Sequence, residues 1–261
     1  MFRIYLRIQG IGMKKTCSKA KVIAASVTGP MHNYRSMPCQ DCFRHKFGGK
    51  NFVAVVSDGA GSAKYGKIGA RIICDTMIDL LSECSFQNIK KRIAEAIEIA
   101  RCRLMRHRLN KSKSAEGLVD FSATLVGAVY CRRKGLFFHI GDGAGIALKQ
   151  DNYEDFTVSR PENGTFSCET FFYTMDDWKD SLRFTPFEDA DTLFLMSDGL
   201  TNFAFSPDYS QIEKGFIVPI NEYLSQESSK AKAVRALNNT LNTPMAKKLN
   251  SDDKTLLWAK I

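Results

Sequence analysis

Residues 51–66, NFVAVVSDGAGSAKYG, decide the fold of this chain. Their apolar, β-branched run is typical of a buried strand, and it ends at Asp58. Gly59 follows at once and removes side-chain bulk beside the Asp58 carboxylate, so a small cation could approach its oxygens. The stretch therefore predicts a stiff strand that holds an acidic group at its end.

The same arrangement returns in LFFHIGDG (136–143) and in DTLFLMSDGL (191–200). Acidic residues also adjoin expected strands in PCQDCF (38–43) and in NSDDKTLLWAK (250–260). A single Asp-Gly pair is typical of an ordinary turn, because both residues favour turn geometry. A fold that gathers the strand ends would nevertheless bring several carboxylates together: Asp41, Asp58, Asp198 and Asp253.

Such a cluster would need a cation, because carboxylates that share a site repel one another. Oxygen ligands without His or Cys partners favour Mg²⁺ or Mn²⁺ over zinc or copper, and the chain has only four histidines. These ions keep several water ligands, so about three or four aspartates suffice for two ions. Cys39 and Cys42 have the CxxC spacing of a zinc or redox site, but no second pair accompanies them.

The composition indicates a globular chain with a sizeable core, since 44% of its 261 residues are hydrophobic. The net charge of +9 is concentrated in residues 90–113, where Lys and Arg alternate with apolar positions as on a solvated helix face. No nucleic-acid-binding motif accompanies this charge, so we expect no nucleic-acid partner. Scattered cysteines and the lack of a long apolar stretch predict a cytoplasmic protein without a membrane partner.

We expect residues 1–20 to be a disordered or atypical N-terminal extension, with Met13 as an alternative start to Met1, and residues 21–261 to be a single domain. Residues 121–150 should form an antiparallel meander of three strands, because their turns are short. Strands, a helix pair, more strands and more helices predict an α+β fold. The expected strands are 22–29, 51–59, 121–131, 135–143, 145–150, 192–199 and 255–261, and the expected helices are 68–84, 89–104 and one or two within 217–242.

The ordered series PCQD, VVSDGAGS, FSATLVGAV, HIGDG, LFLMSDGL and DDKTLLWA resembles the protein phosphatase 2C family of metal-dependent serine/threonine phosphatases, in particular its compact bacterial branch. The resemblance covers residues 22–260. It implies a central β-sandwich of two antiparallel sheets flanked by helices, in α-β-β-α layers. It also implies that a metal-activated water hydrolyses phosphoserine and phosphothreonine in a protein substrate, and that a cognate serine/threonine kinase is a partner.

The resemblance further implies the roles of individual residues. Asp58 would bridge two Mn²⁺ or Mg²⁺ ions, and the backbone carbonyl of Gly59 would help to hold one of them. Asp198 and Asp253 would complete the ligands of the other ion, so that these three aspartates carry catalysis through the metal-activated water. Asp41 would contribute directly or through water.

Two sets of residues leave alternatives open. Arg35 and His32 are equal candidates by position for the phosphate-binding residue, and both could also lie on a surface loop. Asp120 could hold a third, weaker ion or could be a turn residue, and Asp142 is better explained as a hydrogen-bonding residue in a turn. Residues 159–178 would form a flap near the cleft.

Three positions depart from the family pattern. Gln40 stands where the wider family often has a carboxylate, Ala60 replaces a histidine, and Lys254 replaces an asparagine. Gln40 offers a neutral oxygen and no charge, which would weaken one metal site. These departures keep a second interpretation open, in which the protein is a catalytically weak or inactive regulator that binds a phosphorylated partner.

Overall fold

The computed structural model describes residues 20–109, 117–161 and 170–261. The expected N-terminal extension lies outside the described residues, except for Ala20. The strands are β1 (Lys21–Val27), β2 (Cys42–Phe47), β3 (Phe52–Ser57), β4 (Leu125–Cys131), β5 (Lys134–Ile140), β6 (Ala144–Lys149), β7 (Asn152–Ser159), β8 (Arg183–Glu188), β9 (Thr192–Met196) and β10 (Lys254–Lys260). The helices are α1 (Pro30–Tyr34), α2 (Gly66–Leu81), α3 (Ile89–Leu109), α4 (Trp178–Ser181), α5 (Thr201–Ala204), α6 (Lys214–Gln226), α7 (Lys230–Leu241) and α8 (Pro244–Leu249).

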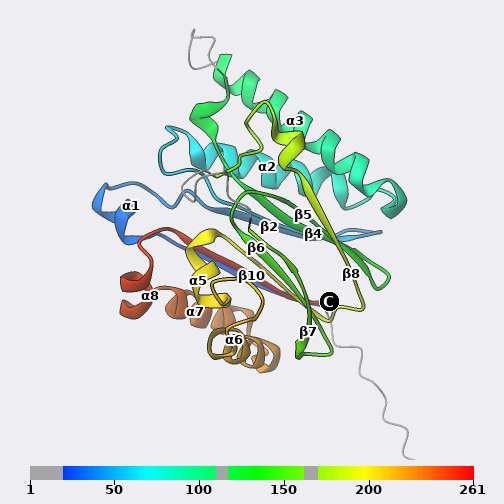
Figure 1. The fold of residues 1–261 in the computed structure, drawn as a ribbon, viewed down its shortest axis with the longest axis vertical. Coiled ribbons are helices and arrows are strands. Elements are labelled where there is room, and N and C mark those ends of the chain that lie inside the picture. Colours follow the sequence, from blue (N-terminus) through cyan, green and yellow to red (C-terminus); the bar gives the residue numbers. More distant parts are fainter. Residues whose placement is uncertain (1–19, 110–116, 162–169) are drawn as a thin grey trace, which may run out of the picture.

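Two five-stranded antiparallel sheets form the centre, with strand orders β1-β10-β9-β6-β7 and β2-β3-β4-β5-β8. Figure 1 shows α2 and α3 on one side of the sheets and α6 and α7 on the other. The expected α-β-β-α sandwich is confirmed. Within the described residues, none of the helices combines the length and the apolar character that crossing a membrane requires.

Strand β3 is buried on both faces, which explains its uninterrupted apolar sequence. Val53 and Val55 belong to the core beneath α2 and α3. Ala54 and Val56 point the other way, into the core between the two sheets. Because successive side chains of a strand alternate between its faces, a central layer of this sandwich needs apolar residues at every position. Strand β9 follows the same rule, so both strands are rigid supports for the residues that follow them.

The expected meander is wrong in its third strand. Strands β4 and β5 pair with each other, but β6 crosses to the other sheet and pairs with β7 and β9. The turn between β5 and β6 explains the crossing, because Gly141 adopts a φ of +108°, which side chains rarely allow. A Cβ at Gly141 would also lie 2.7 Å from Cγ2 of Thr124.

The expected helices 68–84 and 89–104 correspond to α2 and α3, and the segment 217–242 contains α6 and α7. The sequence patterns missed β2, β7 and β8. All three strands lie at sheet edges, and their buried and exposed positions do not alternate regularly. They therefore lack the continuous apolar sequence of a central strand.

Candidate functional site

Four of the acidic segments meet at one end of the sandwich. Asp58 follows the last residue of β3, and Asp198 follows β9 closely. Asp41 precedes β2, and the pair Asp252-Asp253 precedes β10. Since β2 runs antiparallel to β3, and β10 to β9, the start of one strand lies beside the end of the next. The topology therefore converts dispersed sequence motifs into one cluster.

Backbone contacts fix the position of Asp58. Its N–H donates to Oγ1 of Thr124 at 3.0 Å, and its carbonyl accepts from the Thr124 N–H at 2.8 Å. Gly59 lies against the start of α2, where an added Cβ would be 2.3 Å from the carbonyl carbon of Gly66. A glycine at position 59 is thus required by close backbone approach, in addition to leaving space beside the Asp58 carboxylate.

The carboxyl groups of Asp41, Asp58 and Asp198 strongly affect one another. Burial raises the pKa of Asp41 to about 6 and that of Asp198 to about 7. Burial, followed by the charges of Asp41 and Asp198, raises the pKa of Asp58 well above its usual value. Asp252 contributes to this repulsion at both Asp58 and Asp198. Without a compensating positive charge, the cluster therefore opposes its own ionisation.

The donor set of this cluster fits a hard divalent cation. Oδ1 of Asp41 and Oδ1 of Asp198 are buried and have no hydrogen-bond partner among the described residues. The other oxygen of Asp41, Oδ2, accepts from the hydroxyl of Ser197 at 2.8 Å, which holds the carboxylate in place. Buried carboxylate oxygens without a partner are costly unless an ion or water satisfies them. Oxygen donors of this kind suit Mg²⁺ or Mn²⁺.

The expected ligand Asp253 is held by hydrogen bonds within the protein. Asp253 is fully buried, and its oxygens accept backbone N–H groups from Gly29 at 2.7 Å and Gln40 at 2.6 Å. Nδ1 of His32 also lies 2.8 Å from Oδ2 of Asp253, although this contact lacks the angle of a well-formed hydrogen bond. Asp253 thus acts as an internal anchor for the segments that carry Gly29 and Gln40.

The charge of Asp253 acts on Asp41, whereas Asp252 is the member of the pair whose charge acts on Asp58 and Asp198. One oxygen of Asp252 accepts the Asp253 N–H at 2.8 Å. Its charge raises the pKa of both Asp58 and Asp198, whereas Asp253 is not among the main causes for either group. One ligand atom from each of His32, Asp252 and Asp253 also lies within 4.8 Å of the other two, close enough for these three residues to hold a metal ion. The doublet of adjacent aspartates was visible in the sequence, but the sequence alone did not indicate which member acts on Asp58 and Asp198.

Lys254 brings a buried positive charge to the same place. Its ammonium donates to the carbonyl of Asn250 at 2.7 Å and to that of Asp252 at 2.8 Å, and the residue is 1% exposed. Burial lowers the pKa of Lys254, and the nearby aspartates oppose that shift. The lysine at this departure from the family pattern therefore closes the loop that carries Asp252.

Gln40 has a structural role that its sequence position did not reveal. Its Oε1 accepts the backbone N–H of Lys67 at 2.8 Å, in the first turn of α2, and its Nε2 donates to the Pro38 carbonyl at 3.3 Å. The N-terminal N–H groups of a helix have no partner within the helix, so this amide caps α2 from a distant segment. The side-chain oxygen of Gln40 is consequently already engaged.

A Gln40→Leu substitution is expected to lower the free energy of unfolding by about 1–2 kcal/mol, because a lost helix cap typically costs that much. Urea unfolding followed by circular dichroism would measure the change. Gln87→Leu is the matched control: it makes the same change at an exposed position and should lose less stability. Equal losses in the two variants would show that the Lys67 cap does not matter.

The two candidate phosphate-binding residues separate in the structure. His32 is 4% exposed and contacts Asp253, and its Nε2 would lie 3.1 Å from a Cβ added to Gly61. Arg35 follows α1 at the surface with its side chain exposed. Of these two residues, Arg35 is therefore the one whose side chain a phosphate group in solution can reach.

Two further acidic residues also differ in position. Asp120 is exposed on a short turn, and its charge is not a main cause of the raised pKa of Asp41, Asp58 or Asp198. Asp142 accepts from the Thr170 hydroxyl at 2.7 Å, as expected of a turn residue, but its charge also raises the pKa of Asp198. The expected flap, 159–178, lies partly outside the described residues, at 162–169.

The zinc interpretation of Cys39 and Cys42 finds no support, because their thiols have different surroundings. Cys42 joins the core under α2, whereas the thiol of Cys39 lies beside Asp253. Neither belongs to the group of potential metal ligands formed by described residues.

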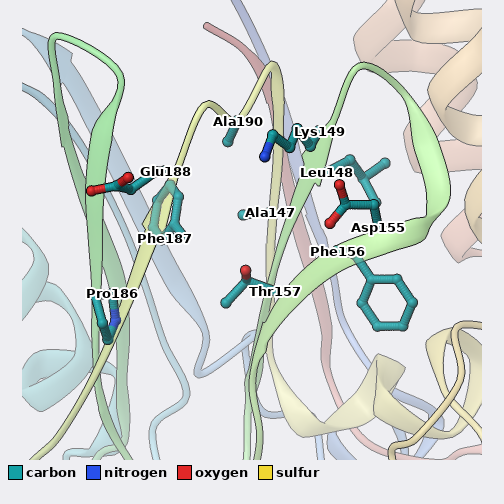
Figure 2. A pocket seen from close by; sticks show the side chains of 10 residues that line it. All are labelled: Ala147, Leu148, Lys149, Asp155, Phe156, Thr157, Pro186, Phe187, Glu188 and Ala190. Atoms are coloured by element: carbon teal, nitrogen blue, oxygen red, sulfur yellow. The ribbon is translucent and has the colours of Figure 1, made fainter.

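A cavity of about 400 Å³ lies away from the carboxylate cluster, between the edge strands of the two sheets. Figure 2 shows Pro186, Phe187 and Glu188 of β8 on one side of it and Thr157 of β7 on the other. Two acidic residues, Asp155 and Glu188, line this cavity. None of the clustered aspartates lines it. Its lining offers no convergent set of ligands for a cation.

Comparisons with known proteins agree with this geometry. A family model described as Protein phosphatase 2C matches residues 28–242. The serine/threonine phosphatase Stp1 from Staphylococcus aureus aligns with a TM-score of 0.63 at 15% identity, over 99% of this chain and 99% of its own. The Mycobacterium tuberculosis serine/threonine phosphatase PstP/Ppp aligns with a TM-score of 0.59 at 14% identity, over 93% and 98% of the two chains. RsbX in complex with magnesium aligns with a TM-score of 0.56 at 15% identity, over 92% and 94%. No curated protein sequence matches the chain.

Proposed function

The chain belongs to the protein phosphatase 2C family, and from this premise we propose that it is a metal-dependent phosphatase that hydrolyses phosphoserine and phosphothreonine in protein substrates. The convergence of Asp41, Asp58 and Asp198 is the observation that carries the proposal, together with one buried oxygen each of Asp41 and Asp198 that lacks a partner among the described residues. Asp252 completes the set in place of the expected Asp253, because it is the member of the pair whose charge reaches Asp58 and Asp198.

The chain's own residues would hold and orient the cation site. Asp58 is central, because its carboxyl interacts with both Asp41 and Asp198. Ser197 orients Asp41 and also accepts the Thr255 N–H at 3.0 Å, which links the ends of β9 and β10. When bound, Mg²⁺ or Mn²⁺ ions would lower the pKa of a water and neutralise charge on the phosphate ester. Positioning and charge stabilisation are the main requirements of phosphoryl transfer, so no nucleophilic side chain is needed.

We infer two ions for this site, with a phosphorylated protein as substrate and a serine/threonine kinase as the opposing enzyme. Several carboxylates in one cluster exceed what a single Mg²⁺ usually takes from a protein. RsbX, which shares the fold, has been solved with magnesium. Arg35 is the better of the two phosphate-binding candidates, since its side chain is exposed and His32 is buried. The exposed position of Asp120 favours a turn residue over a ligand of a third ion.

The proposal is tested by phosphate release from a phosphothreonine peptide after removal of metals with EDTA and subsequent addition of Mn²⁺ or Mg²⁺. We expect activity only with added metal, and a large loss in Asp198→Asn. Asp155→Asn removes the same charge from exposed strand β7 and serves as the control. Saturable peptide binding without phosphate release under any metal condition would favour the non-catalytic regulator instead.

A further inference from the structure

Cys42 and Cys74 form a pair of free thiols behind the carboxylate cluster. Cys42 begins β2, and Cys74 lies within α2. Sγ of Cys74 donates to the backbone oxygen of Cys42 at 3.6 Å, which places the two cysteines side by side. Cys42 is 9% exposed and Cys74 is fully buried. A small reagent would therefore reach Cys42 first.

An arginine supports the same pair. Nη1 of Arg44 donates to Sγ of Cys42 at 3.5 Å. Nε of Arg44 also forms an ion pair at 2.7 Å with Asp75, the residue that follows Cys74. The Arg44 contact holds the Cys42 sulfur in a fixed position. The Arg44–Asp75 pair also links the two elements that carry the thiols.

We propose that Cys42 and Cys74 are an oxidation site, at which a small hydroperoxide produces a disulfide that weakens cation binding by the carboxylate cluster. The consequence for cations rests on the proposed function, whereas disulfide formation does not. The pair differs from the CxxC pair that the sequence suggested, since the thiol of Cys39 lies beside Asp253.

The chemistry needs only the hydroperoxide as oxidant. The Cys42 thiol attacks the peroxide and its proton passes to the departing oxygen, the O–O bond breaks, an alcohol or water leaves, and Cys42 becomes a sulfenic acid. The Cys74 sulfur then attacks the Cys42 sulfur, the S–S bond forms, and the sulfenic oxygen leaves as water. In total, two thiols and one hydroperoxide give one disulfide, one water and one alcohol, or a second water when the oxidant is hydrogen peroxide.

Cys42 lies next to the cluster in two ways. Asp41 is its neighbour in the chain, and Ser57, which precedes Asp58, is its partner in the register of β2 and β3. A disulfide requires a sulfur–sulfur distance of about 2.05 Å and a restricted separation of the two Cα atoms. Bond formation would therefore draw the start of β2 toward α2 and displace Asp41 relative to Asp58.

The first test is chemical and does not depend on phosphatase activity. Cleavage by trypsin gives peptide 36–44, which contains Cys42 and Cys39, and peptide 72–90, which contains Cys74 and Cys84. In a Cys39→Ala, Cys84→Ala background, treatment with hydrogen peroxide should link these two peptides, and dithiothreitol should release them. If this background fails to fold, fragmentation of the linked peptides from the native chain assigns the bridge. Absence of the link, or a bridge from Cys39 to Cys42, overturns the proposal.

The second test measures Mn²⁺ binding by calorimetry before and after oxidation. We expect oxidation to weaken binding at least about ten-fold, reversibly, in the native chain and not in Cys74→Ala. Cys102→Ala removes an exposed thiol on α3 and should respond as the native chain does. Unchanged Mn²⁺ affinity in a chain with the Cys42–Cys74 bridge would overturn the link to the cluster. A native chain that binds Mn²⁺ but never releases phosphate would contradict the proposed function and not this site.

Discussion

An Asp58→Asn protein is expected to lose phosphatase activity by at least about 100-fold, since removing one preorganised electrostatic group from a reaction centre typically costs that much or more. Asp58 interacts with both Asp41 and Asp198, so the substitution removes the proposed central ligand of the cluster. Steady-state hydrolysis of a phosphothreonine peptide at saturating Mn²⁺ would measure the loss. Calorimetry with Mn²⁺ should show weaker binding in the same variant.

The same substitution should stabilise the metal-free protein. The pKa of Asp58 is raised, so its ionised form at neutral pH opposes folding, and a neutral amide removes that cost. We expect a melting temperature a few degrees higher in EDTA, since about 1 kcal/mol corresponds to about 2–4 °C in a chain of this size. The gain should shrink as the pH falls through about 7 and about 6, where Asp198 and Asp41 take up protons.

Asp155→Asn is the charge-matched control for both measurements, because Asp155 is exposed on β7 and away from the cluster. It should change neither activity nor melting temperature appreciably. If Asp58→Asn were fully active, or if it melted below the native chain in EDTA, the cluster would not be the cation site inferred from its geometry.

An Asp253→Ala protein is expected to lose about 3–5 kcal/mol of unfolding free energy, the usual cost of removing one partner from a buried polar or ionic contact. The substitution would leave the N–H groups of Gly29 and Gln40 without an acceptor and His32 without its carboxylate contact. Since Asp253 is fully buried, water cannot readily replace those contacts. Urea unfolding of the metal-free chain would measure the loss.

Asp252→Ala is the comparison that tests the proposed division of roles between Asp252 and Asp253. Asp252 is partly exposed, so its removal should cost little stability. It should nevertheless weaken Mn²⁺ binding, because its charge reaches Asp58 and Asp198. The reverse outcome, with Asp252→Ala unfolded and a stable Asp253→Ala unable to bind Mn²⁺, would restore Asp253 as the ligand.

The central strands were predictable because each is buried on both faces and carries an uninterrupted apolar run, as β3 and β9 do. The edge strands β7 and β8 were not predictable, since exposure to solvent permits polar residues in them. The sheet to which β6 belongs was also beyond the local pattern. It depends on the turn at Gly141, whose backbone direction is set by its surroundings.

Local sequence determined where strands end in acidic residues, because burial of a strand and the turn that follows it are encoded within a few neighbouring positions. Only the tertiary structure decided which aspartates face one another. Asp252 and Asp253 are adjacent and chemically identical, yet Asp253 is held by Gly29, His32 and Gln40, more than 200 positions earlier in the chain, whereas the charge of Asp252 acts on Asp58 and Asp198. That distinction arises from hydrogen bonds between distant segments, which no local pattern of residues can express.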